Sequence, residues 1–532
     1  MSIALDIEPR QPRHAIHPAF EDTLDQRAAR AAHAVEGLAR YEDYGIRRTF
    51  HGFYYISHYY PLRAMRDVDL KTIETRLRDL EEQTFETYIH FPYCEYLCTF
   101  CHFYKKPSGS VTTLLDKEDV ALNRVEREMR MYRDLFGGPI QAHSLQLGGG
   151  TPSMISNKRL VALLETVREC MVLDDDAEIK IEIYPQDYEE GDLREKLQIL
   201  KDFGFTDLVV DLESGNKETL DYINRPRSSL ETYLRVLDVA VSAGHTSFIT
   251  ALMAGLPRET FESLDRTIQT LKSIEEVKVV NVFPVIMRET DPITTQLRRN
   301  PADFHDAATR DQMWIFARNE LRDSGWTEGP ISYLHRSDVR PEQQSDKFEC
   351  VNLLGFGTSG FGYLNGNGWA SQYFNFCNDV DYAKRVDAGE PPIWRMGIYD
   401  QAERARRKVI FGLANVKSAE NLVAIEQCFG VDVDEIYGRT FNALLMLGLI
   451  EVVPIEHGIR FTEDGLARLE EICYLLQSDY AKDACDTQPD ADDPRSKELI
   501  NQHYAVTMPS EDRAAFEALV ADQPREFMHR IR

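Results

Sequence analysis

Short apolar runs alternate with longer amphipathic segments over residues 86–290. Six runs have the length and composition of buried strands, and the segments between them carry apolar residues at helical spacing. The runs cover 87–91, 144–148, 178–184, 207–212, 247–253 and 277–283. Because parallel neighbours need a long crossover, usually a helix, this order predicts an α/β fold with a helix-covered parallel sheet. Periodicity alone does not decide whether the sheet is open or curled into a partial barrel.

The remaining sequence divides around this unit. Two apolar strands at 449–454 and 459–462, preceded by helical segments and followed by a helix from 463, resemble a winged-helix module. Five Asp residues among helix breakers follow at about 482–495, before a short helix at 514–521. We therefore expect five parts: an extension at 1–85, the α/β unit at 86–300, its extension at 301–400, a winged-helix-like α+β module at 401–478, and an acidic linker with a C-terminal helix at 479–532.

Charge and hydropathy limit the classes of binding partner that we expect for this chain. The chain of 532 residues has 61 Lys and Arg against 88 Asp and Glu, a formal charge of −27. Such a surface repels phosphate backbones, so we expect no nucleic-acid partner and assign the winged-helix-like module a lid or scaffold role. Neither a long apolar span nor an apolar stretch of signal-peptide length occurs, so we expect no membrane partner and a cytoplasmic protein.

Three of the nine cysteines stand apart from the rest. Cys94, Cys98 and Cys101 form a C-x3-C-x2-C array directly after the first apolar run, and thiolates bind iron–sulfur clusters and zinc. A structural zinc site needs four ligands, and no second pair follows at a usable spacing, although His102 is adjacent. Three ligands instead leave one iron of a cubane cluster open to an outside molecule. Six others are isolated and are expected to be bystanders: Cys170, Cys350, Cys377, Cys428, Cys473 and Cys485.

The stretch YIHFPYCEYLCTFCHF at 88–103 resembles the radical S-adenosylmethionine (SAM) superfamily. Together with LQLGGGTPSMIS at 145–156, it is similar to the branch of the oxygen-independent coproporphyrinogen III dehydrogenases and their heme-chaperone relatives. Further matches follow in order at 181–185, 223–227, 254–260 and 353–360. The resemblance spans about 85 to 475 and implies a partial (β/α)6 radical SAM barrel over 86–300.

The resemblance also implies cofactors and their ligands. A 4Fe-4S cluster would be held by Cys94, Cys98 and Cys101, with SAM on the open iron. Glycines at the end of the second strand, just before a helix, allow backbone N–H groups to approach a ligand closely. The SAM contacts implied by the resemblance are Tyr88, Phe100, Gly149, Gly150, Thr151, Glu182, Glu213 and Arg225.

Three departures from the coproporphyrinogen enzymes guide the choice of reaction. Glu213 replaces a Gln, Ala251 replaces an Asp, and Phe103 replaces a further Cys. They favour a member that binds two SAM molecules, like the class C radical SAM methyltransferases and cyclopropanating enzymes. There, a methylene radical made from the second SAM adds to an sp2 carbon of a small-molecule substrate. Part of the second SAM site is expected at Gly355 and Gly357, within 301–400.

Two alternatives remain open. The first is oxidative decarboxylation of coproporphyrinogen III, whose propionates would need cations such as Arg47 and Arg48. The second is a heme-binding chaperone, with His51, His90 or His102 as axial ligands. Both enzymatic interpretations imply a small-molecule substrate and an electron donor such as flavodoxin or ferredoxin.

Overall fold

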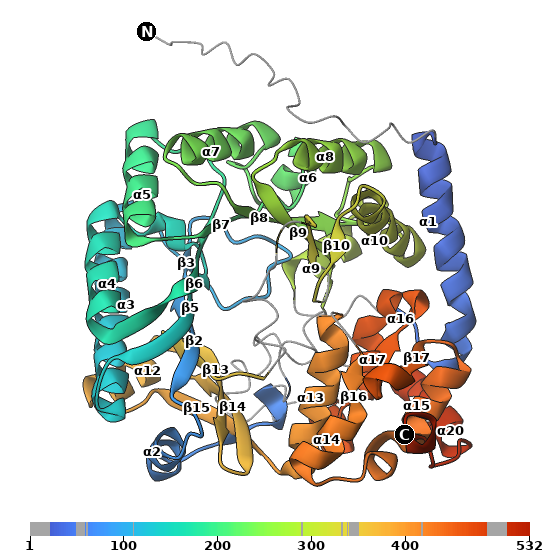
Figure 1. Cartoon of the computed structure of the whole chain (residues 1–532). Coiled ribbons are helices and arrows are strands. Elements are labelled where there is room, and N and C mark those ends of the chain that lie inside the picture. Colours follow the sequence, from blue (N-terminus) through green and yellow to red (C-terminus); the bar gives the residue numbers. More distant parts are fainter. Residues whose placement is uncertain are drawn as a thin grey trace.

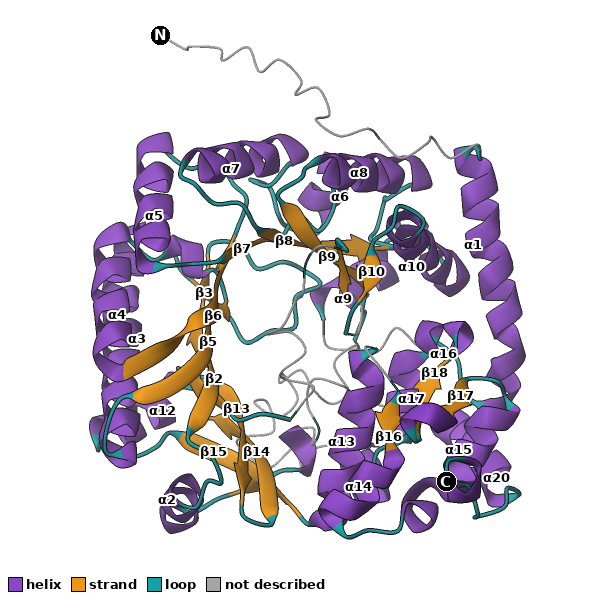
Figure 2. Cartoon of the chain, in the orientation of Figure 1, coloured by secondary structure: helices purple, strands orange, loops and turns teal. Residues whose placement is uncertain are grey.

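A curved sheet with helices outside it organises the chain. The computed structural model describes residues 22–48, 59, 62–109, 111–288, 291–330, 333–337, 339, 350–416, 419–486 and 508–532. Figure 1 follows the chain from blue to red, and Figure 2 shows the strands forming an arc whose convex side is covered by helices. The sheet is therefore curled, which the sequence pattern had left undecided.

Six parallel strands form the core of this sheet, each hydrogen-bonded to the next. They are β2 (Thr84–Phe91), β5 (Ile140–Gly149), β6 (Met171–Ile183), β7 (Asp207–Val210), β8 (Phe248–Ala254) and β9 (Val277–Pro284). All six overlap the apolar runs that predict them. The successive crossovers use α3 (Val111–Phe136), α4 (Asn157–Cys170), α5 (Glu190–Phe203), α6 (Lys217–Tyr222), α7 (Leu230–Ser242) and α8 (Phe261–Ser273), and α10 (Ala307–Arg322) follows β9. The predicted α/β fold with a partial (β/α)6 barrel is confirmed.

Local sequence fixes where these helices start. Ser229 caps α7: its hydroxyl accepts from the Thr232 amide at 3.0 Å, and the Thr232 hydroxyl accepts from the Ser229 amide at 2.8 Å. Thr260 and Ser263 form the same reciprocal capping box at the start of α8. Each box satisfies two backbone N–H groups that have no partner within the helix. The strand-to-helix turns of the barrel are therefore set by residues close in sequence.

The sheet continues past the barrel on both sides to thirteen strands. β12 (Leu353–Phe356) pairs parallel with β2, so a strand from late in the chain adjoins the first barrel strand. Antiparallel strands follow from it: β13 (Phe361–Gly366), β14 (Trp369–Asn375), β15 (Ile393–Tyr399) and β1 (Arg66–Asp67). On the other side lie β11 (Tyr333–His335) and β10 (Thr327–Glu328). Helices α2 (Leu70–Arg78), α9 (Pro292–Arg299) and α12 (Asp379–Asp387) complete this region.

The C-terminal part is a separate small sheet among helices, at the lower right of Figure 1. β18 (Gly458–Phe461) pairs antiparallel with β17 (Ile450–Val453) and with β16 (Glu420–Asn421), so the predicted two-stranded hairpin gains a third strand. Its helices are α13 (Gln401–Asn415), α14 (Leu422–Phe429), α15 (Val433–Met446), α16 (Glu463–Ala467), α17 (Leu469–Leu475), α18 (Asp479–Asp486) and α20 (Ser510–Ala521). Among the described residues, no helix combines the length and apolar character needed to cross a bilayer.

The N-terminal extension ties the barrel to this C-terminal part. α1 (Leu24–Leu38) presents Arg27, whose Nη1 lies 2.9 Å from Asp265 and 2.5 Å from Glu320. Arg48 is buried, with Nε 3.3 Å from Asp311 on α10 and Nη1 3.5 Å from Glu470 on α17. The proposal that Arg48 meets a substrate propionate is therefore wrong, because its charge is already paired with protein carboxylates.

Arg47, the second cation of that proposal, lies 3.0 Å from Asp512 at the start of α20. It too is engaged by the C-terminal part. The tyrosine-rich stretch that follows these arginines lies mostly outside the described residues, as does His51.

Candidate active site

A cavity of about 380 Å³ opens among the residues at the carboxyl ends of the barrel strands. Most of its wall comes from alternate residues of the strands, since successive side chains of a strand point to opposite faces. From β2, β5, β6, β7, β8 and β9, and from the residue after β7, these are Glu86, Tyr88, His90, Ser144, Gln146, Lys180, Glu182, Val209, Asp211, Ile249, Ala251, Asn281 and Phe283; Thr87, Gly149 and Ile183 also line the cavity. Many are polar although they lie inside a sheet, which indicates a binding site rather than a packed core.

The three predicted cluster ligands share this cavity. Cys94, Cys98 and Cys101 all line it, on the loop that follows β2. The loop is closed at its base by a short parallel pair of β3 (Tyr93–Cys94) and β4 (Lys106–Pro107), and the Ser108 amide donates to the Cys94 carbonyl at 2.8 Å. A local turn, with the Cys101 amide donating to the Cys98 carbonyl at 3.2 Å, holds the other two cysteines together.

The cysteine set fits an iron–sulfur cluster. Burial raises the pKa of Cys94 to about 12 and that of Cys98 to about 11, so both thiols are protonated until a metal displaces the proton. Among the described residues, no three Cys, His, Asp or Glu side chains converge closely enough for a single ion. Three cysteines on one loop that all line the same cavity match the ligand set of a 4Fe-4S cluster, in which each thiolate binds a different iron.

The glycine segment at the end of β5 is hydrogen-bonded to the strand that leads into the cysteine loop. The Gly150 amide donates to the Phe91 carbonyl at 2.6 Å and the Thr151 amide to the Tyr93 carbonyl at 2.8 Å. These two N–H groups hold the strand leading into Cys94. Gly149, Gly150 and Thr151 all line the cavity, and their contact with SAM stays a prediction. Gly149, with φ +114°, has no room for a Cβ, which would lie 2.7 Å from the His90 ring. The glycines thus bring two strand ends together beneath the cysteine loop.

Glu182 faces the cavity from β6. Its Oε2 accepts from the Gly149 amide and its Oε1 from the Gln146 side chain, each at 3.2 Å. Burial, followed by the charge of Asp211, raises the pKa of Glu182 to about 8. In the part of the chain that the structure describes, Glu182 forms no ion pair, so it is suited to meet a positive or hydrogen-bond-donating group of a ligand.

Arg225 links the cysteine loop to β7. Its Nη1 lies 3.9 Å from Cys98 Sγ and 3.2 Å from Glu213 Oε1, and its Nη2 donates to the Asp211 carbonyl at 2.6 Å. The guanidinium also lies over the Tyr184 ring, 4.6 Å from its centroid. Burial raises the pKa of Glu213 to about 7, against the opposing effect of Arg225. A cation is thus held between a cluster ligand and two buried acids.

His90 is locked in the wall of the cavity. One ring nitrogen lies 3.0 Å from the Tyr88 hydroxyl and the other 3.1 Å from the Tyr104 carbonyl. Burial lowers its pKa to about 4, so the ring is neutral at pH 7. With both nitrogens engaged, His90 is a poor axial ligand for heme. Phe100 and Tyr88, both predicted, line the same cavity.

Gly355 and Gly357 do not line the cavity in the described part of the structure. A Cβ on Gly355 would lie 2.0 Å from the Phe361 carbonyl oxygen, and one on Gly357 would lie 2.6 Å from the His90 carbonyl oxygen. Gly355 thus allows close packing of β12 against β13, and Gly357, just after β12, allows the chain to pass close to β2. From the same segment, Ser359 and Phe361 do face the cavity.

Sequence reasoning missed several polar residues of this wall. In the strands that supply them, polar residues interrupt apolar runs. Lys180 and Glu182 alternate with isoleucines in EIKIEIY, and Asp211 follows two valines. Reading the polar residues of every strand at a period of two would have found Lys180, Asp211 and Asn281. Tyr333 and Lys105 come from short or irregular segments and carry no such signal.

Comparisons with known proteins agree with this geometry. The family model described as the radical SAM superfamily matches residues 88–271. The oxygen-independent coproporphyrinogen III oxidase of Salmonella typhimurium is 26% identical over 415 residues, which cover 75% of this chain and 86% of that protein. The heme chaperone HemW of Bacillus subtilis is 24% identical over 280 residues, covering 52% of this chain and 71% of that protein.

Among solved structures, the coproporphyrinogen III oxidase HemN from Escherichia coli aligns with a TM-score of 0.67 at 23% identity. The alignment covers 78% of this chain and 95% of that one. At this identity the likeness establishes the fold. It extends well beyond the matched domain at 88–271, so the barrel and most of the remaining chain follow the architecture of that structure.

Proposed function

Since the chain is a radical SAM enzyme with HemN-like relatives, we propose that it oxidatively decarboxylates a coproporphyrinogen-type substrate. The observation that carries the proposal is the extent of the similarity, 75% of this chain against 86% of a coproporphyrinogen III oxidase. Short motifs shared by the whole superfamily would not extend so far. This ranks decarboxylation above the methylene transfer favoured by the sequence departures.

The chain's residues divide the work by position. Cys94, Cys98 and Cys101 would hold a 4Fe-4S cluster. With the cluster and SAM bound, reductive cleavage of SAM supplies methionine and a 5′-deoxyadenosyl radical that abstracts a hydrogen atom. Glu182, whose pKa is about 8, would accept hydrogen bonds from the donor groups of SAM. Arg225 would hold the cysteine loop in place through its contact with Cys98. Curvature of the sheet brings these groups around one cavity, where the protein can orient a bound cofactor.

The balance of the proposed reaction is as follows for each propionate. One hydrogen atom leaves the side chain and ends in 5′-deoxyadenosine. The carboxylate departs as carbon dioxide, the carbon–carbon double bond of a vinyl group forms, and one electron passes to an acceptor. An electron donor of the flavodoxin or ferredoxin class is proposed to supply the electron that SAM cleavage consumes.

A second candidate rests on the charge of the cavity. Its wall carries Glu86, Glu182, Asp211 and Glu213 against the cations Lys105, Lys180 and Arg225. Of these cations, Lys180 already lies 2.7 Å from Glu178, and Arg225 pairs with Glu213. The ammonium and sulfonium groups of a second SAM would favour the ionised form of these carboxyls, whereas a tetra-anionic porphyrinogen would gain no attraction from them. Methylene transfer to an sp2 carbon, with Ser359 and Phe361 beside the second SAM, therefore stands as the alternative.

A heme-chaperone function has less support from the site. The heme-chaperone relative covers 52% of the chain. His90 has both ring nitrogens engaged, one by the Tyr88 hydroxyl and the other by the Tyr104 carbonyl. A heme titration that yields no Soret band is the expected result.

The test is anaerobic reconstitution with iron and sulfide, followed by mass spectrometry of the products. Decarboxylation predicts carbon dioxide and a vinyl product from coproporphyrinogen III, with 5′-deoxyadenosine and without S-adenosylhomocysteine. Methylene transfer instead predicts one S-adenosylhomocysteine and one 5′-deoxyadenosine per product. Cys98→Ala must abolish SAM cleavage, whereas Cys428→Ala, a matched change at an exposed cysteine on α14, must not. Retention of full cleavage by Cys98→Ala would exclude every radical SAM function.

A further inference from the structure

A second and larger cavity, of about 630 Å³, lies away from the cysteine loop. Its wall includes Thr84 at the start of β2 and His143 near the start of β5, whereas the candidate active site uses later residues of both strands. The opposite wall comes from α13 and α14 of the C-terminal part. The two cavities share no lining residue among those described, so the second needs its own explanation.

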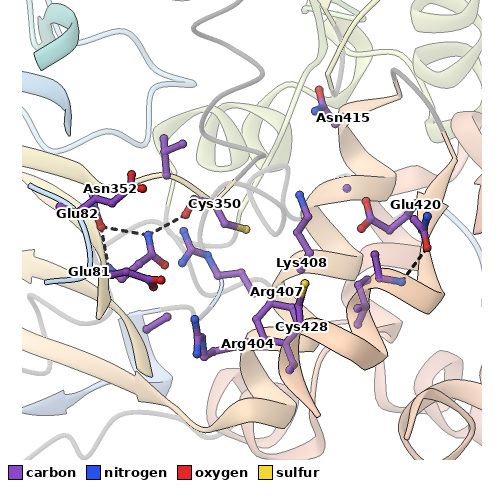
Figure 3. Close-up of a pocket in the computed structure, with 18 of the residues that line it drawn as sticks. Glu81, Glu82, Cys350, Asn352, Arg404, Arg407, Lys408, Asn415, Glu420 and Cys428 are labelled. Atoms are coloured by element: carbon purple, nitrogen blue, oxygen red, sulfur yellow. Dashed lines mark hydrogen bonds between the residues drawn. The ribbon is translucent and has the colours of Figure 1, made fainter. Parts of the chain in front are cut away.

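Three cations on one face of α13 enter this cavity. Arg404, Arg407 and Lys408 are three and four residues apart, the spacing that places side chains on the same side of a helix. Figure 3 shows Arg407 reaching from the helix toward the segment that carries Cys350 and Asn352. Arg407 is only 1% exposed, and Arg404 and Lys408 are half-buried beside it.

The acidic residues of the cavity sit less deeply. Glu81 and Glu82, just before β2, are exposed, so solvent screens their charges. Glu420 is half-buried, and its Oε2 lies close above Gly412, one turn along α13 from Lys408. Arg407 forms no ion pair with any of them within the described residues. The buried floor therefore carries more positive than negative charge.

Arg407 lacks hydrogen-bond acceptors as well. In the portion of the chain that the structure describes, its Nε and Nη2 are buried and have no hydrogen-bond partner. The guanidinium lies over Tyr363, 4.4 Å from the ring centroid, and over Phe411 at 5.2 Å. Aromatic faces attract the charge but accept no conventional hydrogen bond, so burial leaves these donors unsatisfied.

Two neutral side chains of the same wall, Asn365 and Asn352, are by contrast hydrogen-bonded. The Asn365 side chain donates to the Cys350 carbonyl at 2.8 Å and to Asn352 Oδ1 at 3.1 Å. These two amides of the wall therefore complete each other's polar contacts and accept nothing from the guanidinium of Arg407. Paired N–H donors of a guanidinium match the two oxygens of a carboxylate or phosphate.

We propose that this cavity binds a small molecule through an oxyanion, either a carboxylate or a phosphate. Arg407 holds the oxyanion through its guanidinium group, and Arg404 and Lys408 add charge at its sides. The apolar remainder of the ligand packs against Ala424, Ile425 and Phe429 of α14. The volume lies within the range of about 300–1,000 Å³ typical of small-molecule sites. This site is independent of the SAM chemistry proposed above.

Calorimetric titration of the full-length, reconstituted protein tests the proposal. Inorganic phosphate and succinate are the probes, each added at constant ionic strength against sodium chloride. At least one should bind saturably, and Arg407→Met should weaken that binding at least tenfold. Arg404→Gln and Lys408→Gln should each weaken it severalfold. Arg406→Met is the matched control, because Arg406 lies over Tyr437, with 5.2 Å to the centroid, and does not line the cavity.

The titrations distinguish the class of ligand and test the role of Arg407. Preference for phosphate indicates a phosphorylated ligand, and preference for succinate indicates a carboxylated one. Binding of neither above the chloride control overturns the proposal, as does Arg407→Met binding like the wild type. A thermal midpoint is the second readout: without anions, Arg407→Met should be at least as stable as the wild type. A less stable variant, together with no anion effect on the wild type, would mean that Arg407 serves packing alone.

Discussion

Arg225 Nη1 lies 3.9 Å from Cys98 Sγ. This contact joins a loop after β7 to the middle ligand of the cysteine array, although the two residues are 127 positions apart. Because the same guanidinium contacts Glu213 and the Asp211 carbonyl, it fixes the distance between the cysteine loop and the barrel wall.

Arg225→Gln should lower the yield of 5′-deoxyadenosine at least tenfold while the three cysteines still bind iron. The shorter, neutral side chain leaves Glu213 and Asp211 buried without their cation, a change that costs about 3–5 kcal/mol when a buried pair is broken. Product assay and electron paramagnetic resonance of the reduced protein measure the two effects. Arg258→Gln is the control, since Arg258 also lies over a tyrosine, at 4.5 Å, but on the surface. Equal losses in both variants would contradict the assigned role.

Gly149→Ala should destabilise the protein by about 2 kcal/mol or more and weaken SAM binding. A Cβ at this position meets the His90 ring at 2.7 Å, and φ +114° is a strained conformation for alanine. The shift also moves the amide that donates to Glu182. Denaturant unfolding and SAM titration provide the measurements. Gly138→Ala, in the turn before the same strand, has no atom within 4 Å of its Cβ and should change little.

Glu128→Gln should remove part of the decrease in stability that the wild type shows as pH rises. Glu128 on α3 is fully buried and accepts from the Gly357 amide, the Asn375 side chain and the Tyr382 hydroxyl, at 2.8, 2.9 and 2.6 Å. Burial raises its pKa from 4.5 to about 8. The folded state then binds more protons than the unfolded state between these values, so its stability falls as pH rises from about 5 to 8.

The glutamine variant removes that loss. Its free energy of unfolding relative to the wild type should increase by about 3 kcal/mol between pH 5 and pH 8, since one pKa unit corresponds to about 1.4 kcal/mol. Chemical denaturation at four pH values measures the difference. A difference that stays constant with pH would show that Glu128 is ionised in the folded protein throughout.

Arg48→Met should destabilise the protein by about 3–5 kcal/mol without changing the products of the residual enzyme. Its removal leaves Asp311, Glu470 and Glu471 buried with less compensation. Within the described residues, Arg468 pairs with Asp311, at 2.8 Å, and with neither glutamate. Denaturant unfolding and product analysis separate structure from substrate binding. Arg30→Met, at an exposed surface pair, is the control and should cost under about 1 kcal/mol. A changed product pattern would return Arg48 to the substrate site.

Much of the fold was predictable because its signals are local. Each of the six barrel strands matches a short apolar run, and capping residues such as Ser229 and Thr260 lie next to the helices they start. The cysteine array was equally readable, since Cys94, Cys98 and Cys101 lie within eight residues and must share a site. Local spacing did not predict that Glu182 and Arg225 share a cavity; that prediction came from the family resemblance.

What the sequence determined by itself was therefore the order of strands and helices and the set of thiolate ligands, because both depend on neighbours along the chain. Tertiary structure decided how residues far apart share or satisfy charge. In the folded chain, buried Arg48 forms ion pairs with α10 and α17, and the amides of Gly150 and Thr151 donate to protein carbonyls. Folding also brings Arg225 into contact with Cys98. It also left Arg407 buried without acceptors. A charge is compensated by whatever the fold brings near it, and that proximity is not written in local spacing.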